Sequence, residues 1–298
     1  LPTFSTAAAV RVVLTGLLFL SSATWNGAVL WSVARAPRPP RVQVLVANLA
    51  AADLLVTLVV MPLDAAWNVT VQWHGGDVAC KALMFLKLVA MYSSAFGTVL
   101  IALDRHAAIV TPLARGCTHR RNKAMMGAAW GLSVLLALPQ VFVFRTVRRR
   151  RPRCFVQCAT LGSFGARWQE TLYNMVTFCC LFLLPLLIMV LCYGHILLTI
   201  SSRMKDPGGS SRGFHLRRSS DNTPRARTRT LRMSIAIVLT FILCWTPYYL
   251  LGLWYWFSPE MLTREKVPPA LSHILFLFGL FNTCLDPLIY GFFTARFR

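Results

Sequence analysis

Seven long apolar runs constrain the fold of this chain more than any other feature of its sequence. A helix needs roughly 20 residues to cross about 30 Å of hydrocarbon, and each run is long enough to do so. The runs cover approximately residues 7–34, 42–67, 78–110, 123–145, 168–200, 229–257 and 268–293. They predict an all-α membrane protein, a single domain built as a seven-transmembrane helix bundle with its termini on opposite sides of the bilayer.

The composition excludes an ordinary soluble domain. Of the 298 residues, 56% are hydrophobic and only 14% are charged, and the mean hydropathy is +0.56. The net charge of +21 is typical of nucleic-acid-binding proteins, but these place their basic residues on one face of a soluble fold. Here most basic residues lie between the apolar runs, where membrane topology and contact with anionic lipid explain them. We therefore expect membrane lipid as a partner and no nucleic acid.

The Lys and Arg residues between the runs predict the orientation of the chain. Three basic connections follow the first, third and fifth runs, at residues 35–41, 115–123 and 203–232. We place these connections in the cytoplasm, which puts the N-terminus outside the cell. The arginines of residues 148–153 oppose this assignment, but they are fewer than those on the predicted inner side. Residues 201–223 are polar, basic and rich in Gly and Ser, and are expected to form a flexible cytoplasmic loop.

Three of the nine cysteines fall on the predicted outer side, which is oxidising. Cys80, Cys154 and Cys158 therefore predict one disulfide and one remaining thiol. We favour a bond between Cys80, at the start of the third run, and Cys158 in the next outer loop. Cys154 then either pairs with a cysteine upstream of Leu1 or is a free thiol, and the sequence leaves both alternatives open.

Two acidic residues lie deep inside apolar runs. Asp53 is in the second run, and Asp286 precedes Pro287 at an expected break in the seventh. An ionisable group at such a depth is costly unless it is paired, hydrated or protonated, and it therefore indicates a functional site. We expect Asp53 and Asp286 to lie in one pocket and to share a proton or a cation such as sodium.

Polar residues also gather toward the outer ends of the runs. Asp64 and Asn68 are four residues apart and so share one helix face. Lys87 lies two turns after Cys80, and Asn174 is near the outer end of the fifth run. These residues predict an outward-facing polar pocket. The alternative is that Asp64 and Lys87 simply neutralise each other.

The sixth run contains a proline beside several aromatic residues. Pro247 removes a backbone donor and should bend a helix, although in a membrane the helix can continue through the bend. Trp245 and Tyr248 lie beside it, so we interpret this segment as a lever between the two membrane faces. At the end of the third run, Asp104 and Arg105 are adjacent. They either belong to a functional site or are ordinary interfacial side chains.

These residues together resemble a known family, the rhodopsin-like (class A) G-protein-coupled receptors. The resemblance extends over the whole chain and rests on Asp53, the Cys80/Cys158 pair, Asp104-Arg105, Cys244-Trp245-x-Pro247 and Asp286-Pro287-x-x-Tyr290. A closer resemblance is to the gonadotropin-releasing hormone receptors. It is carried by residues 61–73, by Leu253-Trp254-Tyr255-Trp256-Phe257 and by the unusual aspartate at Asp286.

Within that family the chain resembles the type II receptors. Mammalian type I receptors have asparagine at the position of Asp53, whereas here both Asp53 and Asp286 are acidic, as in type II and non-mammalian receptors. Residues 258–269 also lack the type I acidic residue that favours an arginine-bearing hormone. The resemblance therefore implies a preference for the tyrosine-bearing type II hormone.

The resemblance also implies the ligand, the partner and the roles of individual residues. The ligand is an amidated decapeptide, gonadotropin-releasing hormone, and the receptor is expected in the plasma membrane. Its partner is a heterotrimeric G protein of the Gq/11 class, which activates phospholipase C and thereby calcium release. The implied ligand-binding residues are Asp64, Asn68, Lys87, Asn174, Trp245, Tyr248 and Tyr255. Those implied in activation and coupling are Asp53, Asp104, Arg105, Pro247, Asp286, Pro287 and Tyr290. Arg105 is expected to pair with Asp104 at rest.

Other functions fit the sequence less well. A class A receptor for another amidated neuropeptide is the first alternative. A retinal-binding light receptor needs a Schiff-base lysine in the seventh span, and residues 268–293 contain none. A membrane transporter should show an internal repeat, and we find none. No enzyme motif is present and the six histidines do not cluster, so we expect neither catalysis nor a cofactor.

Overall fold

The computed structural model describes residues 6–70, 72–111, 115–149, 155–205, 222–257 and 269–295. Some predictions concern residues outside these ranges. They are the partner of Cys154, the flexibility of most of the loop 201–223, and the part of the type II assignment that depends on residues 258–268.

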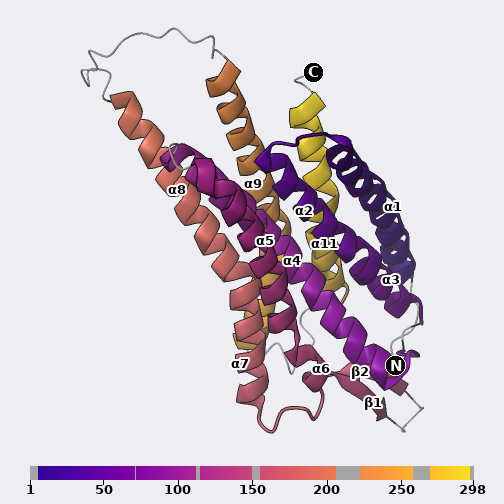
Figure 1. Ribbon diagram of the computed structural model, residues 1–298. Helices are drawn as coiled ribbons and strands as arrows, with labels where there is room; N and C mark the ends of the chain where they lie inside the picture. Colours follow the sequence, from indigo (N-terminus) through magenta and orange to yellow (C-terminus); the bar gives the residue numbers. More distant parts are fainter. Residues whose placement is uncertain are drawn as a thin grey trace, which may run out of the picture.

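Seven helical spans form the bundle and confirm the predicted fold class (Figure 1). The membrane-spanning parts begin and end within about three residues of their predicted bounds, although the helices of the fourth and sixth spans start earlier, at Arg115 and Asn222. In the described part of the chain, the seven spans are α1 (Thr6–Arg35); α2 (Arg41–Leu55), a π-helical turn (Val56–Val60) and α3 (Met61–Thr70); α4 (Gly76–Val110); α5 (Arg115–Ala137) and α6 (Pro139–Val143); α7 (Arg167–Phe178), a π-helical turn (Cys179–Leu183) and α8 (Leu184–Lys205); α9 (Asn222–Phe257); and α11 (Pro269–Ala295).

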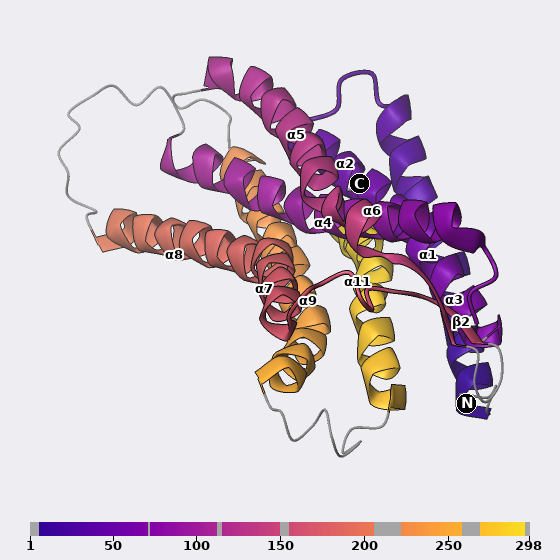
Figure 2. The ribbon, with the colours of Figure 1, turned by 90° about the horizontal axis from the view of Figure 1, so that it is seen from below.

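The third span, α4, is the centre of the bundle. Its apolar stretch is 83% buried, compared with 17% in the first and fourth spans, whose outer faces are left for lipid. Figure 2 shows α4 crossing the middle of the bundle, with α5 on one side and α9 and α11 on the other. Polar residues on α4 are therefore positioned to contact several other spans at once.

Both π-helical turns lie just before a proline. The turn Val56–Val60 precedes Pro62, and the turn Cys179–Leu183 precedes Pro185. A proline ring crowds the carbonyl four residues earlier, and in both spans that carbonyl belongs to the wider π turn. The chain therefore stays helical past each proline while changing direction.

Pro247 and Pro287 lie inside α-helices that have no such turn. The helix α9 continues through Pro247, as predicted for a span in a membrane. We expected the seventh span to break at Pro287, and this is wrong, because α11 continues to Ala295. Neighbouring spans compensate for the lost backbone donor in a packed bundle, so the proline does not end the helix.

A β-hairpin follows the fourth span. Its strands β1 (Arg145–Arg149) and β2 (Phe155–Ala159) pair antiparallel, with Thr146 opposite Cys158. We expected only an arginine-rich loop here, and placed the end of the fourth span slightly too late. Thr, Val and Phe favour strands, but five-residue strands give little signal beside a run of arginines.

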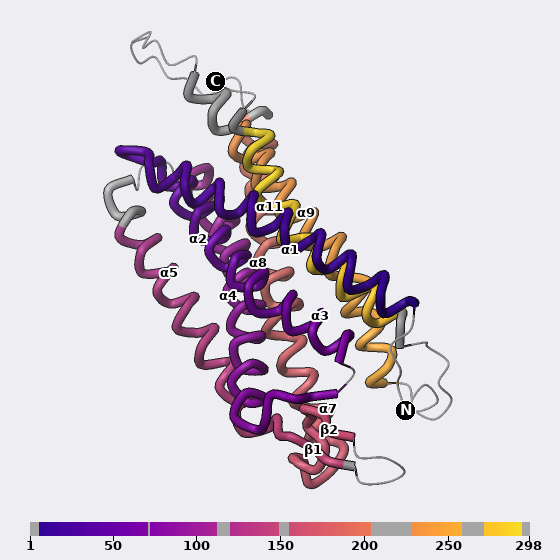
Figure 3. Tube along the Cα trace, turned by 90° about the vertical axis from the view of Figure 1, so that its right-hand side faces the viewer, coloured from indigo at the N-terminus to yellow at the C-terminus, as the bar shows by residue number. Residues whose placement is uncertain are grey.

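The hairpin marks one end of the bundle. The helix α1 begins near this end, and α11 finishes at the opposite end (Figures 1 and 3). We call these the hairpin end and the Arg105 end, since Arg105 lies near the last turn of α4.

Candidate functional site

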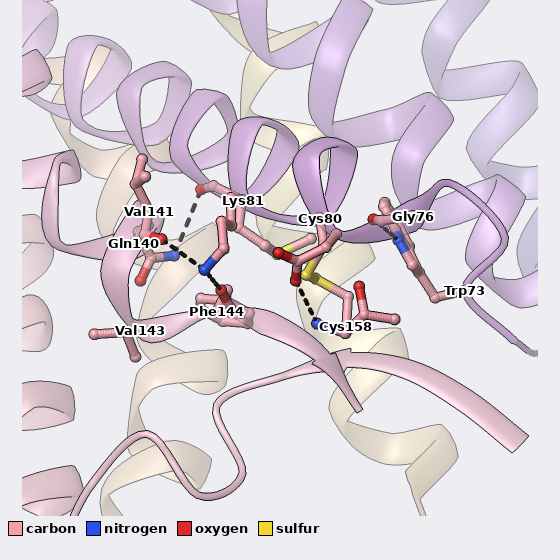
Figure 4. The surroundings of a disulfide bond; sticks show 12 residues. Trp73, Gly76, Cys80, Lys81, Gln140, Val141, Val143, Phe144 and Cys158 are labelled. Carbon is pink, nitrogen blue, oxygen red and sulfur yellow. Dashed lines mark hydrogen bonds between the residues drawn. A yellow bond between two sulfur atoms is a disulfide. The ribbon is translucent and has the colours of Figure 1, made fainter. Parts of the chain in front are cut away.

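A disulfide joins the hairpin to the first turns of α4 (Figure 4). It links Cys80 to Cys158, which confirms the predicted pair. The backbone amide of Trp73 adds a hydrogen bond to the carbonyl of Val156, at 2.8 Å. Both cysteines and Trp73 are buried in one small cluster, so the hairpin is held against the bundle.

Polar contacts strengthen this attachment. Lys81 donates from Nζ to the carbonyl oxygens of Val141, at 3.1 Å, and Phe144, at 2.9 Å (Figure 4). A cation suits this place because the last carbonyls of a helix lack partners within the helix. The amide of Thr146 donates to Oδ1 of Asp77 at 3.0 Å. Sequence inspection missed Lys81 because its partners are backbone atoms about 60 residues away.

A cavity of about 500 Å³ is enclosed by residues of the third, fourth, fifth, sixth and seventh spans, toward the hairpin end. This volume lies within the usual range of ligand sites, roughly 300–1,000 Å³. Four of the seven residues predicted to bind ligand line the cavity, namely Lys87, Asn174, Tyr248 and Tyr255. Asp64, Asn68 and Trp245 lie outside its lining. Most of the other lining residues are aromatic or aliphatic, so the cavity suits a ligand with large apolar side chains.

Lys87 and Asp64 approach each other without closing an ion pair. Nζ of Lys87 lies 5.1 Å from the ring centroid of Phe276, a cation–π distance. Asp64 and Lys87 interact electrostatically, but in the described chain they are not joined by a contact within 4.0 Å. Nδ2 of Asn68 donates to the carbonyl oxygen and to Oδ2 of Asp64, at 3.0 and 3.3 Å, so these residues do share a face. The charges therefore remain able to bind a third group.

Two further basic residues interact electrostatically with Asp64. They are Arg11 on α1 and His273 on α11. Nη1 of Arg11 is buried and makes no hydrogen bond within the described structure. We did not select either residue from the sequence. An ionisable side chain inside an apolar run was the available signal, but only the folded bundle brings these two beside Asp64.

An amide inside the fourth span also contributes to the cavity. Gln140 lines it and accepts a short hydrogen bond from the hydroxyl of Tyr173. Nε2 of Gln140 donates to the carbonyl oxygen of Met84 at 3.5 Å. Amides in membrane spans commonly join helices in this way, and here Gln140 connects the third, fourth and fifth spans.

Trp245 lies in an aromatic cluster on α9 and α11. Its ring centroid is 5.9 Å from that of Phe276, and 6.0 Å from those of Tyr248 and Tyr249. Tyr248 and Phe276 also line the large cavity. A ligand that moved these rings would therefore press on Trp245, which is two residues from Pro247.

Asp53 and Asp286 lie together in the middle of the bundle, as predicted. They are 0% and 4% exposed, and the two carboxyl groups interact electrostatically. Oδ1 of Asp53 accepts a hydrogen bond from Ser94 at 2.7 Å. The other three carboxyl oxygens and Oδ1 of Asn282 are buried and receive no hydrogen bond from another group in the described structure, while the two carboxyl groups are close enough to hydrogen-bond to each other through a shared proton. An all-oxygen set of this kind fits a hard cation or a shared proton.

At the Arg105 end the charges are paired. Arg105 donates to Oδ2 of Asp104 from Nη2 at 2.7 Å and from Nε at 3.2 Å, so the predicted pair is present. Nδ2 of Asn122 donates to Oδ1 of Asp104 at 2.9 Å, and Nη1 of Arg105 donates to Oγ1 of Thr230 at 2.8 Å. Arg105 thereby connects α4 with α9, while Asn122 connects α4 with α5. Tyr290 is buried near this end of α11.

Two histidines meet near the same end. Nε2 of His106 and Nδ1 of His195 are 2.8 Å apart, across α4 and α8. Our expectation that the histidines do not cluster is wrong for this pair, because residues distant in sequence meet at an interface between spans. Across the described residues, no group of three or more His, Cys, Asp or Glu could hold a metal ion.

The sequence is similar to those of known proteins. The family model for the 7 transmembrane receptor (rhodopsin family) matches residues 25–290. The gonadotropin-releasing hormone II receptor of Chlorocebus aethiops is 63% identical, over 100% of this chain and 79% of its own length. The chain belongs to the rhodopsin-family gonadotropin-releasing hormone receptors. The II receptor of Clarias gariepinus is 52% identical over the same shares, and the gonadotropin-releasing hormone receptor of Trichosurus vulpecula is 45% identical over 99% and 92%.

Membership of this family fixes the general nature of the protein. It is a G-protein-coupled receptor and not an enzyme, and it is a multi-pass protein of the plasma membrane. As a receptor of this family it has a peptide ligand and a G-protein partner.

Proposed function

We propose that this receptor binds gonadotropin-releasing hormone, prefers its type II form, and signals through Gq/11 to phospholipase C and calcium. The observation that carries the proposal is the 500 Å³ cavity, whose lining places Lys87 and Asn174 among aromatic side chains, with Asp64 interacting electrostatically with Lys87 without an ion pair. An acid, a cation and amides within aromatic walls match the mixed chemistry of an amidated peptide.

The cavity opens to the outside of the cell in this proposal. The disulfide at the hairpin end supports that orientation, because disulfides persist in oxidising compartments and are rare in the cytosol. The Arg105 end then faces the cytoplasm, together with the basic connections 35–41 and 115–123.

Hormone contacts divide between two parts of the site. Asp64 and Lys87 bind the N-terminal part of the peptide, and Asn68 binds its terminal amide. Tyr255 contacts a side chain in the middle of the hormone, because it lines the cavity and remains 47% exposed. Asn174 and Tyr248 line the deeper part, above Trp245.

Activation is a shift between two packings of the bundle. A hormone that rearranges the rings around Trp245 favours the packing in which α9 swings at Pro247. This movement separates Thr230 from Arg105, since their 2.8 Å hydrogen bond joins α9 to α4. Arg105 then becomes available to Gq/11. Asp286, Pro287 and Tyr290 adjust the seventh span to the moved α9.

Asp53 and Asp286 are the proposed sodium site, with Ser94 and Asn282 as neighbouring oxygen donors. The buried oxygens without partners support this assignment. Sodium would supply positive charge that allows both carboxyl groups to be ionised in one pocket.

The type II preference rests on two observations. The gonadotropin-releasing hormone II receptors of Chlorocebus aethiops and Clarias gariepinus are 63% and 52% identical to this chain, above the 45% of the Trichosurus vulpecula receptor. Asp53 and Asp286 are also both acidic, as the resemblance to type II receptors requires.

Calcium release in transfected cells tests the proposal. We expect the hormone form with tyrosine at position eight to act at concentrations about tenfold lower than the form with arginine there, a difference of ~1.4 kcal/mol. Cells with empty vector are the control. Equal potency or an arginine preference would refute the type II assignment. A response to a different amidated peptide alone would favour the first alternative, and peptide-independent solute flux would favour a transporter.

A further inference from the structure

Gly279 on α11 is in unusually close contact with Trp245. A Cβ atom built on Gly279 would lie 2.4 Å from both Cε3 and Cζ3 of the indole, and 2.8 Å from Cδ2. Real Cβ atoms essentially never approach another heavy atom so closely. The indole therefore lies directly against the bare backbone of the seventh span, where α9 and α11 run side by side (Figure 3).

Other glycines in the spans do not show this contact. A Cβ atom on Gly131 or Gly194 would meet nothing within 4 Å. On Gly97 it would meet the side chain of Leu49 at 3.3 Å, a contact that a small shift relieves. Glycine is a poor helix former, so its presence at 279 inside a membrane span calls for a local reason. The ring of Trp245 supplies that reason.

The indole also has space to move into. A cavity of about 20 Å³, enough for roughly one water, borders Trp245. Apart from Trp245, it is lined mainly by residues of the third, fifth and sixth spans, including Met91, Leu181 and Phe241. A ring displaced from Gly279 can shift toward this space instead of forcing the helices apart.

We propose that Gly279 is the positioning residue for Trp245: its missing side chain allows the indole to rest on α11, and this contact sets the balance between the resting and active packings. The inference deepens the proposed function, on which its signalling part rests. Glycine at this position allows the ring to pack against α11 until bound hormone moves it. A single added methyl group should prevent this contact and favour the packing of the bundle that hormone otherwise induces.

A double-mutant cycle tests the proposal with Gly279→Ala, Trp245→Phe and their combination. Phenylalanine lacks equivalents of Cε3 and Cζ3, the two atoms nearest to the added methyl group. Gly131→Ala is the matched control. Two quantities are measured: inositol phosphate production without hormone, per receptor at the cell surface, and the thermal unfolding midpoint of the purified full chain in detergent.

We expect Gly279→Ala to raise hormone-independent signalling at least about threefold and to lower the unfolding midpoint. Gly131→Ala should leave basal signalling unchanged and slightly raise the midpoint, because alanine is the better helix former. In the Trp245→Phe background, the change at 279 should have a clearly smaller effect on both quantities, because phenylalanine removes the two closest atoms but keeps an equivalent of Cδ2. If Gly279→Ala is not expressed, recovery of expression by the added Trp245→Phe supports the same conclusion.

Two results would overturn the inference. One is a Gly279→Ala receptor that matches Gly131→Ala in both measurements. The other is an effect of Gly279→Ala, including lost expression, that is undiminished with phenylalanine at 245. Failure of the proposed function is distinguishable: the wild-type receptor would then respond to neither hormone form, while the unfolding midpoints would still report whether Gly279 seats Trp245.

Discussion

The two ends of the bundle hold their charged residues in opposite ways. At the hairpin end, Lys87 and Asp64 interact electrostatically but do not form an ion pair within the described chain. At the other end, Arg105 and Asp104 are paired at 2.7 Å, with Asn122 and Thr230 completing the hydrogen bonds. The side chains of Arg105 and Asp104 are 9% and 1% exposed, so leaving either charge unpaired would be costly.

This difference shows where each end can accept a partner. The hairpin end keeps charge and hydrogen-bonding capacity for a ligand without first losing internal contacts. The Arg105 end must break bonds between α4 and α9 before the guanidinium can bind anything else. Under the proposed function, this asymmetry keeps the G-protein site at the Arg105 end closed until the hormone binds.

Removal of the arginine should have the largest effect. We expect Arg105→Ala to abolish hormone-driven inositol phosphate production while the receptor still reaches the cell surface. The reason is that the cytoplasmic contact depends on this guanidinium in the proposed function. Arg120→Ala, an exposed arginine on α5, is the control. Full signalling by Arg105→Ala at normal expression would refute its assigned role.

Neutralising the acid at the hairpin end should have an intermediate effect. Asp64→Asn is expected to weaken hormone binding about thirtyfold, or ~2 kcal/mol, because a charge-assisted hydrogen bond is lost. Radiolabelled-peptide binding and surface expression are measured together. Glu170→Gln, an exposed acid-to-amide change on α7, should alter neither. Equal losses of binding and expression in Asp64→Asn would mean that this carboxylate is structural.

The smallest effect is expected from Asn122, the uncharged residue that donates a hydrogen bond to Asp104 at the Arg105 end. Asn122→Ala removes the 2.9 Å hydrogen bond to Asp104 and loosens α4 from α5. We expect basal signalling to rise about fivefold, equivalent to ~1 kcal/mol lost from the resting packing. Exposed Ser201→Ala is a suitable control for a lost polar group. Unchanged basal signalling would show that Asn122 does not hold the pair in its resting arrangement.

Hydropathy alone predicted the seven spans, because a membrane span must be long, apolar and helical whatever its neighbours are. Asp53, Asp286 and Arg105 were also found from the sequence, since a charge in an apolar run is conspicuous. The Cys80–Cys158 bond followed from the predicted location of the cysteines. These features depend on local composition, which the sequence states directly.

Apart from the meeting of Asp53 with Asp286, features that depend on which spans meet were missed. Arg11 and His273 matter because they converge on Asp64 from two other helices, and Lys81 matters because of two distant carbonyls. Gly279 had no signal at all, since its significance lies in the ring that covers it. The hairpin was hidden because its strands are short and one of them is mostly arginine.

The attachment of the hairpin to α4 fixes one part of the cavity wall, because Phe144 precedes β1, lines the cavity and accepts a hydrogen bond from Lys81. The disulfide and the contacts of Lys81 and Asp77 hold this segment against the most buried span of the described structure. Widening of the cavity is therefore expected from helices that these bonds do not hold, including α9 and α11, which carry Tyr255 and Ser272. Those helices also hold Trp245 and Gly279, so the admission of a ligand and the release of the indole would use the same moving parts.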